Sequence, residues 1–210
     1  MRIGVIGGGS IGATAAKLFA DAGHEVAIAN SRGPGTLGDV VNRIGDRARA
    51  ATVDDAVAFG NLMLVAIPFG PYRELPTHVP PGTIVVDAMN YYPARDGHFA
   101  ELDDDSTTSS ELLAAHLPGA RVVKAFNTMN WRTQRDGARW GPRDERLVLC
   151  VAGDDVGAKA RVSRLIEEIG FAAVNTGGLA DGGRRQQPGS AIYGKEMTAP
   201  EAQEALGVAG

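Results

Sequence analysis

Six residues near the amino terminus carry the clearest chemical pattern in the chain. Gly7-Gly8-Gly9-Ser10-Ile11-Gly12 matches G-x-G-x-x-G, with an apolar segment before it and an amphipathic segment after it. In such a turn the first glycine permits the tight bend, the second lets a pyrophosphate approach the backbone, and the third lets helix and strand pack closely. The anion then binds the free amides at the helix N-terminus. The motif therefore predicts a dinucleotide site.

A second cluster indicates which dinucleotide is bound. Asn30 lies 18 residues past Gly12, near the distance of about 20 at which an acidic residue binds the ribose of NAD. The run Asn30-Ser31-Arg32 instead has no carboxylate to repel a 2′-phosphate and supplies a hydroxyl and a planar guanidinium. These residues favour NADP over NAD. The alternative is that Arg32 is only a solvated loop charge.

Three further loops follow apolar, strand-like runs. They are Ile67-Pro68-Phe69-Gly70, Met89-Asn90-Tyr91-Tyr92 and Ala125-Phe126-Asn127-Thr128-Met129. Ligands of doubly wound folds bind where such loops leave the carboxyl edge of the sheet. The apolar members could pack on a nicotinamide ring while backbone amides hold its carboxamide, although Pro68 and Met89 could equally be core residues.

Polar groups of the same loops could orient a substrate. Tyr91, Tyr92, Asn127 and Asn130 are the candidates, but none is paired by spacing with an evident base. We therefore predict no proton-transfer triad and name no catalytic side chain.

Other reactive residue types favour structural roles. The four histidines are scattered without metal-ligand spacing, and His24 is expected at the surface in a helix-to-strand turn. The acidic run from Asp103 to Asp105 is expected to be a solvated loop, and no metal site is predicted. Cys150 stands in the apolar run Leu147 to Val151, which favours a buried structural thiol.

The hydroxyl-rich run from Ser106 to Ser110 precedes Glu111 and a helical stretch from Leu112 to His116. A serine or threonine followed by a glutamate is typical of a capped helix start. The alternative is that these hydroxyls line a pocket beside the nicotinamide.

The elements that would position these groups follow from the apolar pattern. Near-continuous apolar runs favour strands of a parallel sheet that is covered on both faces; the runs are Ile3 to Ile6, Val26 to Ala29, Leu62 to Ile67, Ile84 to Val86, Val122 to Ala125 and Leu147 to Val151. Helical patterns cover Ile11 to Ala22, ended by Gly23, then Asp154 to Ile169 and Pro200 to Leu206. The stretches Asn90 to Ser110 and Asn127 to Arg146 fit no regular element, and long irregular connections are often functional.

The predicted fold class is α/β, a doubly wound parallel sheet of the Rossmann NAD(P)-binding type with a small C-terminal appendage. Residues 1–145 would form the dinucleotide-binding domain. Residues 146–210 would form a small α/β extension that completes the second-substrate pocket. A chain of 210 residues is too short for two full domains.

Composition narrows the function classes. Hydrophobic residues make up 44% and charged residues 22%, as in an ordinary soluble globular protein. A formal net charge of -4 gives no wide basic surface and argues against a nucleic-acid partner. The longest apolar stretch, Leu62 to Phe69, is too short to span a bilayer. We predict a cytoplasmic protein without a membrane partner.

Through these motifs the chain resembles a known protein family. The matching segments are Ile3 to Gly12, Asn30 to Pro34, Ala66 to Phe69, Val86 to Asn90 and Lys124 to Thr128. Over nearly its whole length the chain resembles the NADPH-dependent reductases of the deazaflavin coenzyme F420, with the closest match in their bacterial branch of predicted dinucleotide-binding proteins.

The resemblance implies direct hydride transfer between stacked rings, without covalent or metal chemistry, and a homodimer. Carried over by position, Gly9 and Ser10 would contact the pyrophosphate, Ser31 and Arg32 the 2′-phosphate, and Ile67, Met89 and Ala125 the nicotinamide half. Two departures from the archaeal pattern stand out. Thr36 occupies the region of an archaeal lysine, and the Asn90 to Ser110 segment with its double tyrosine lies where the second substrate would bind.

Two functions follow as hypotheses. The first is an NADP(H)-dependent oxidoreductase that transfers hydride between NADPH and F420, or a flavin such as FMN or FAD. Only 64 residues follow Arg146, which favours a small cap and a flat pocket for a planar acceptor. The second is a non-enzymatic NADP(H)-binding or redox-sensing protein, motivated by the lack of an evident catalytic side chain.

Overall fold

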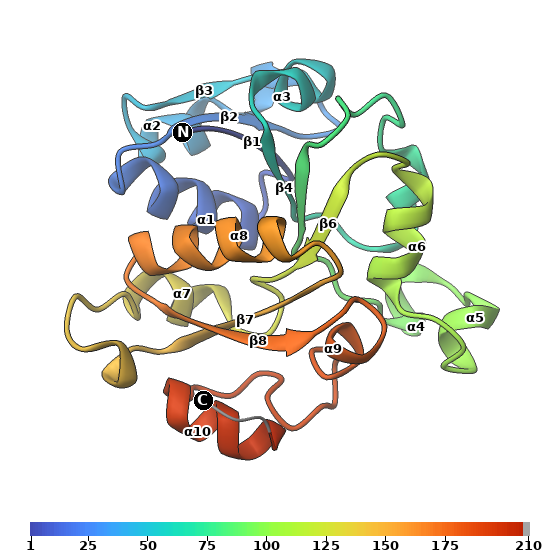
Figure 1. Ribbon diagram of the computed structural model, residues 1–210. Coiled ribbons are helices and arrows are strands. Elements are labelled where there is room, and N and C mark those ends of the chain that lie inside the picture. Colours follow the sequence, from blue (N-terminus) through green and yellow to red (C-terminus); the bar gives the residue numbers. More distant parts are fainter. Residues whose placement is uncertain (208–210) are drawn as a thin grey trace.

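A computed structural model describes residues 1–207 of the chain. Its described strands form one eight-stranded sheet in the order β3-β2-β1-β4-β5-β6-β7-β8 (Figure 1). The strands are β1 (Arg2–Ile6), β2 (Glu25–Ala29), β3 (Ala48–Ala50), β4 (Leu62–Val65), β5 (Ile84–Asp87), β6 (Arg121–Lys124), β7 (Val148–Gly153) and β8 (Ala172–Gly177). Strands β1 to β6 are mutually parallel, β7 is antiparallel to β6, and β8 is parallel to β7.

Helices connect these strands and cover both faces of the sheet. The α-helices are α1 (Ser10–Asp21), α2 (Gly38–Ile44), α3 (Val53–Phe59), α4 (Pro93–Asp96), α5 (Ala100–Asp103), α6 (Ser109–His116), α7 (Trp131–Asp136), α8 (Val156–Glu168), α9 (Asp181–Arg184) and α10 (Ala199–Leu206). Short 3₁₀ helices are η1 (Pro34–Thr36), η2 (Gly70–Glu74) and η3 (Arg143–Glu145). Helix α1 ends as predicted, because Gly23 adopts a φ of 88° just past its C-cap.

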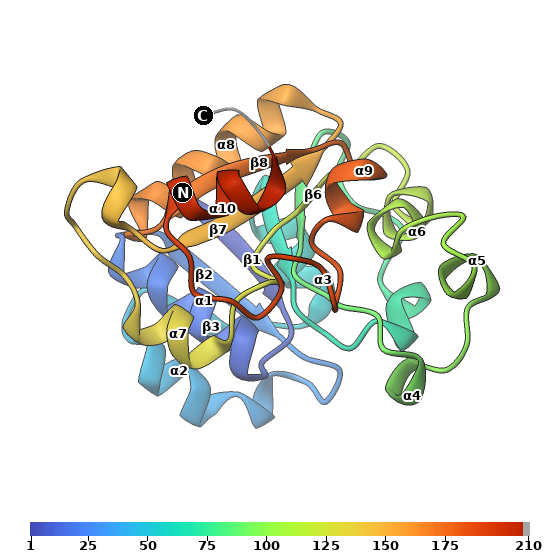
Figure 2. The ribbon, with the colours of Figure 1, turned by 90° about the horizontal axis from the view of Figure 1, so that it is seen from below.

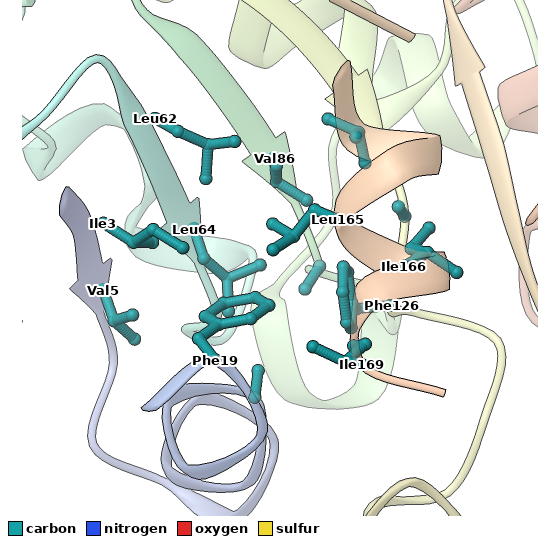
Figure 3. Close-up of a cluster of buried hydrophobic side chains, with 14 of the residues drawn as sticks. Ile3, Val5, Phe19, Leu62, Leu64, Val86, Phe126, Leu165, Ile166 and Ile169 are labelled. Carbon is teal, nitrogen blue, oxygen red and sulfur yellow. The ribbon is translucent and has the colours of Figure 1, made fainter. Parts of the chain in front are cut away.

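Alternate residues of each strand supply two separate apolar layers. Ile3 and Val5 face a cluster that includes Phe19 of α1 and Leu165 of α8 (Figure 3), whereas Met63 belongs to the opposite layer with α3, η2 and α6. Helices α8 and α10 lie on opposite sides of β7 and β8 (Figures 1 and 2). Both faces of the sheet are therefore buried, which explains why its central strands read as continuous apolar runs.

All six predicted strands are confirmed, and so are the helices at α1, α8 and α10. Strands β3 and β8 were missed because β3 is only partly buried and β8 is rich in alanine and polar residues. The expectation of an all-parallel sheet is corrected at β7, where Lys124 pairs with Ala152 in antiparallel register. An apolar run specifies a buried strand but not its direction.

Residues 146–207 extend the same sheet through β7 and β8, so the predicted boundary at residue 145 crosses a continuous apolar layer that includes Leu149 and Val162. That boundary stays a prediction, and the last three residues of the predicted extension lie outside the described residues.

Two expectations about single side chains have opposite outcomes. Cys150 is buried as predicted, and burial raises the pKa of its thiol to about 12. The predicted surface position of His24 is wrong: it is 7% exposed, its Nε2 lies 3.1 Å from Glu168 Oε2, and burial lowers its pKa. Helix α8 packs over this turn, which sequence spacing alone does not reveal.

Residues 1–207 contain neither a candidate membrane-spanning helix nor a candidate metal site. None of their helices combines the length and the hydropathy needed to cross a membrane. No group of three or more His, Cys, Asp or Glu side chains among them is placed to bind a metal ion.

Candidate dinucleotide and substrate site

The carboxyl ends of β1, β4, β5 and β6 open into one pocket of about 420 Å³, called here the edge pocket. This volume is within the range of small-molecule sites. Its lining residues come from four sheet-edge loops and from the segment before α10: Gly9, Ser10, Ile11, Ala66, Ile67, Pro68, Ala88, Met89, Asn90, Tyr92, Arg95, Phe126, Asn127, Thr128, Met129, Asn130, Trp131, Tyr193 and Gly194. Sequence-distant loops thus meet at the predicted sheet edge.

The three glycines of the motif have different physical roles. Gly7 has a φ of 118°, and a Cβ there would lie 2.2 Å from the Ala66 carbonyl oxygen. A Cβ on Gly12 would lie 1.9 Å from the Gly7 oxygen, whereas a Cβ on Gly9 would meet no atom within 4 Å. Gly7 and Gly12 therefore shape the turn, and Gly9 leaves open space above it.

Helix α1 begins at this turn, and no side chain of its own cap or first turn occupies the place where an anionic ligand would bind. Its N-cap, Gly9, provides no side-chain hydrogen bond, and its first turn contains no acidic residue. The first amides of a helix lack intrahelical acceptors and carry the positive end of its dipole. This end of α1 is therefore suited to an anionic group.

The loop after β2 is held by its own side chains. Asn30 Oδ1 accepts from the Arg32 amide at 3.0 Å, and Asn30 Nδ2 donates to Thr36 Oγ1 at 2.9 Å. Thr36 in turn donates to the Gly33 carbonyl at 2.9 Å. Thr36 thus has a structural role in this loop. Ser31 and Arg32 are exposed, and the Arg32 guanidinium forms no hydrogen bond or ion pair within residues 1–207.

A buried ion pair fixes the backbone at Met89. Lys124 and Asp87 are 1% and 0% exposed, and Lys124 Nζ lies 3.1 Å from Asp87 Oδ2. Lys124 Nζ also donates to the Met89 carbonyl at 2.6 Å, while Asp87 Oδ1 accepts from the Met89 amide at 2.9 Å. Both backbone polar groups of a pocket-lining residue are therefore held by buried charges.

Two asparagines link the second and third loops. Asn127 Nδ2 donates to Asn90 Oδ1 at 3.1 Å and to the Gln186 carbonyl at 2.8 Å. Asn90 Nδ2 donates back to the Asn127 carbonyl at 2.9 Å. These bonds fix the orientation of both amides. The buried Asn127 Oδ1 has no hydrogen-bond partner within the described chain.

The Asn127 loop carries backbone strain. Phe126 is fully buried and has a φ of 66°, a left-handed conformation that is rare for a bulky residue. Gln134, also fully buried, donates from Nε2 to the Phe126 and Met129 carbonyls, each at 3.0 Å. Strained residues of this kind cluster at functional sites and persist where the surrounding structure holds them.

Two tyrosines and an arginine form the polar wall of the pocket. The Tyr92 and Tyr193 hydroxyls are hydrogen-bonded to each other, and Asn90 Nδ2 donates to Tyr193 at 3.2 Å. Arg95 lies over the Tyr92 ring, 4.9 Å from its centroid, and donates to the Asn90 carbonyl at 2.6 Å. Burial raises the pKa of Tyr193 well above its usual range.

Seven of the predicted cofactor-binding residues line the edge pocket, whereas Gly7, Gly12, Asn30, Ser31 and Arg32 do not. The seven are Gly9, Ser10, Ile11, Ile67, Pro68, Met89 and Asn90. Ala125 does not line it, being fully buried. Tyr91 lies outside too, packed against Phe69 and donating from its hydroxyl to Asp103 at 2.6 Å.

Sequence reasoning missed Arg95, Trp131, Tyr193 and Gly194 as pocket residues. The one available signal was the prediction that the segments containing Arg95 and Trp131 are irregular. That prediction is wrong at these two residues, because Arg95 lies in the short helix α4 and Trp131 begins α7. Tyr193 gave no signal, because its position depends on the chain passing the sheet edge, where Gly194 donates to the Thr128 carbonyl at 2.8 Å.

The hydroxyl run before α6 caps that helix. Thr108 accepts from the Glu111 amide and Glu111 accepts from the Thr108 amide, which is a capping box. None of these hydroxyls lines the edge pocket. Ser110 instead donates to Asp87 Oδ2 at 2.6 Å, so this run supports the buried ion pair as well.

A second hollow of about 870 Å³ adjoins the first. It follows α1 and α2 and shares Gly9, Ser10 and Trp131 with the edge pocket. Lys17, Arg43 and Arg135 contribute its positive charges. The two hollows together offer more room than a nicotinamide ring requires.

Comparison with known proteins agrees with this geometry. Residues 2–91 match the family model described as NADP oxidoreductase, coenzyme F420-dependent. A solved hypothetical protein of Sinorhizobium meliloti is 32% identical, with a TM-score of 0.80 and coverage of 94% of this chain and 95% of that one. The chain belongs to the F420-dependent NADP oxidoreductase family. A candidate F420-dependent NADP reductase from Arthrobacter sp. FB24 is 27% identical, with a TM-score of 0.75 and coverage of 94% and 99%.

Two further matches are to longer proteins. The rat metalloreductase STEAP3 is 28% identical over 182 residues, and the match covers 85% of this chain but only 34% of that relative. The chain thus spans about a third of the length of this curated relative. The reductive aminase of Aspergillus terreus, solved with NADPH, is 18% identical with a TM-score of 0.60 and covers 86% of this chain and 56% of that one. It shows the shared fold alone.

Proposed function

We propose that this NADP oxidoreductase family member binds NADP(H) along the carboxyl edge of the sheet and passes a hydride to a planar deazaflavin or flavin-type acceptor. The observation that carries the proposal is that one sheet edge presents, in order, an exposed Ser31-Arg32 pair, an uncapped helix N-terminus and an apolar pocket. These three sites match a 2′-phosphate, a pyrophosphate and a nicotinamide.

Two local features fit this cofactor. The open space over Gly9 is the space that a pyrophosphate needs to approach the backbone. The buried Asn127 Oδ1 lacks a donor, and a carboxamide carries N–H donors that would satisfy it. Bound NADPH would supply two electrons as a hydride, while Met89 and Ile67 pack beside its ring and Arg32 engages its 2′-phosphate.

The lining of the edge pocket favours a conjugated acceptor. Among the described residues Arg95 is its one charged side chain, and the aromatic residues Tyr92, Trp131 and Tyr193 form part of its wall. Such a surface suits a flat ring that takes up negative charge on reduction. The predicted extension from residue 146 would complete this pocket through Tyr193. The homodimer implied by the family resemblance stays a prediction.

Anaerobic NADPH oxidation, followed at the nicotinamide absorbance band, tests this proposal. Oxidised F420, FMN and FAD are supplied in turn, and ferric citrate is added as a fourth acceptor because the rat relative is a metalloreductase. We expect turnover with F420 or a flavin. Tight NADPH binding without turnover on any of these acceptors would overturn the enzymatic proposal and favour a redox-sensing role.

Gly9→Ala should weaken NADPH and NADH equally, by about tenfold in Kd. The added Cβ meets no protein atom, so folding should be unaffected, but it occupies the space proposed for the pyrophosphate that both dinucleotides share. Isothermal titration measures both constants. Gly141→Ala is the matched control, since its Cβ would make only an ordinary contact with Glu145 at 3.6 Å. Unchanged affinities in Gly9→Ala would place the pyrophosphate elsewhere.

A further inference from the structure

Tyr92 and Tyr193 of the edge pocket have two hydroxyl protons between them, but only one of these protons takes part in a hydrogen bond. Their hydroxyls share a single hydrogen bond, in which one phenol donates and the other accepts. Two phenols carry two protons. The second proton has no acceptor within residues 1–207, although both side chains line the pocket. The pair therefore presents one unused O–H donor to whatever the pocket binds.

The side-chain amides of Asn90 and Asn127 determine what kind of group can accept a hydrogen bond from the free phenol. Asn90 Nδ2 donates to the Tyr193 oxygen, and Asn127 holds Asn90 in that orientation through Asn90 Oδ1. Asn90 therefore cannot turn its own oxygen toward the phenols to accept their proton. The free phenol proton remains available to a ligand that carries a hydrogen-bond acceptor.

Burial keeps this donor neutral despite the nearby positive charge of Arg95, which is itself paired with Asp96 at 2.8 Å. No carboxylate of residues 1–207 lines the edge pocket, and the Arg95 guanidinium lies over the Tyr92 ring. Because burial raises the pKa of Tyr193, that phenol keeps its proton at neutral pH. Preorganised donors aimed at developing negative charge are a major source of catalysis.

We propose that the Tyr92–Tyr193 pair donates a hydrogen bond to the ring carbonyl or ring nitrogen of the acceptor on which negative charge develops during hydride uptake. This rests on the proposed function and assigns the substrate class as a conjugated ring with a carbonyl or imine edge. The phenols stay protonated throughout. The proton that completes the reduction comes from water.

Three variants test this assignment: Tyr92→Phe, Tyr193→Phe and the double variant. Each single variant keeps one free phenol proton, so kcat should fall by no more than about fivefold. The double variant removes both protons, and its kcat should fall about 100-fold, the loss typical of one such donor. The KM for NADPH should not change. Tyr91→Phe is the matched control, because its hydroxyl bonds to Asp103 outside the pocket.

A second readout does not depend on turnover. Raman spectra of the bound oxidised acceptor should show its ring carbonyl stretch at a lower frequency in the wild type than in the double variant, because a hydrogen bond from a phenol weakens the C=O bond. A double variant that keeps both the kcat and the carbonyl frequency of the wild type would overturn the inference and leave the proposed function standing. A wild type that reduces no acceptor would overturn both.

Discussion

Lys124→Met should lower the free energy of unfolding by about 3–5 kcal/mol. The substitution leaves Asp87, which is 0% exposed, as a buried carboxylate without its cationic partner. It also removes the 2.6 Å hydrogen bond to the Met89 carbonyl. The loss far exceeds that of a surface ion pair, because water cannot replace the missing partner. Urea titration followed by circular dichroism measures the change.

The double variant Lys124→Met with Asp87→Asn separates charge burial from loop positioning. The neutral amide that this variant carries at position 87 can still accept from the Met89 amide through its oxygen, and its NH₂ group, in place of Asp87 Oδ2, can donate to the Ser110 hydroxyl oxygen. Most of the lost stability should therefore return. The Met89 carbonyl still lacks its donor, so NADPH binding should stay weaker than in the wild type. A single variant that loses less than about 1 kcal/mol would show that the pair is not the buried anchor described above.

Arg32→Ala should weaken NADPH binding by about 1.5–3 kcal/mol, or roughly 10- to 150-fold in Kd, and leave NADH nearly unchanged. Asn30 holds the Arg32 backbone through a 3.0 Å hydrogen bond, so removal of the side chain should not disturb the loop. The guanidinium is exposed and would contact only the 2′-phosphate, which NADH lacks. Fluorescence titration with each dinucleotide measures the discrimination.

Arg32→Lys should give an intermediate loss, since it keeps the charge but not the planar fork. Arg164→Ala is the control for removal of an exposed arginine, because this residue lies on α8 and lines neither hollow. Equal losses for NADPH and NADH in Arg32→Ala would contradict the assignment of the 2′-phosphate to this loop.

The amino acid sequence by itself predicted the fold class and the positions of most central elements. The apolar runs became strands because both faces of the sheet are covered, and the glycine motif formed its turn because Gly7 and Gly12 occupy positions where a Cβ would collide with backbone. These features depend on residues close together in the chain. Local spacing and residue type are therefore sufficient to find them.

The tertiary structure decided what completes the candidate site. Tyr92 and Tyr193 are 101 residues apart and meet only because the segment before α10 returns to the sheet edge. In the sequence Lys124 stands within an apolar, strand-like run, and nothing near it indicates an ionic partner. Its buried partner Asp87 lies on the neighbouring strand, 37 residues earlier in the chain. The antiparallel direction of β7 likewise follows from long-range packing. No local pattern encodes such contacts, because their free energy arises only when distant segments exclude water together.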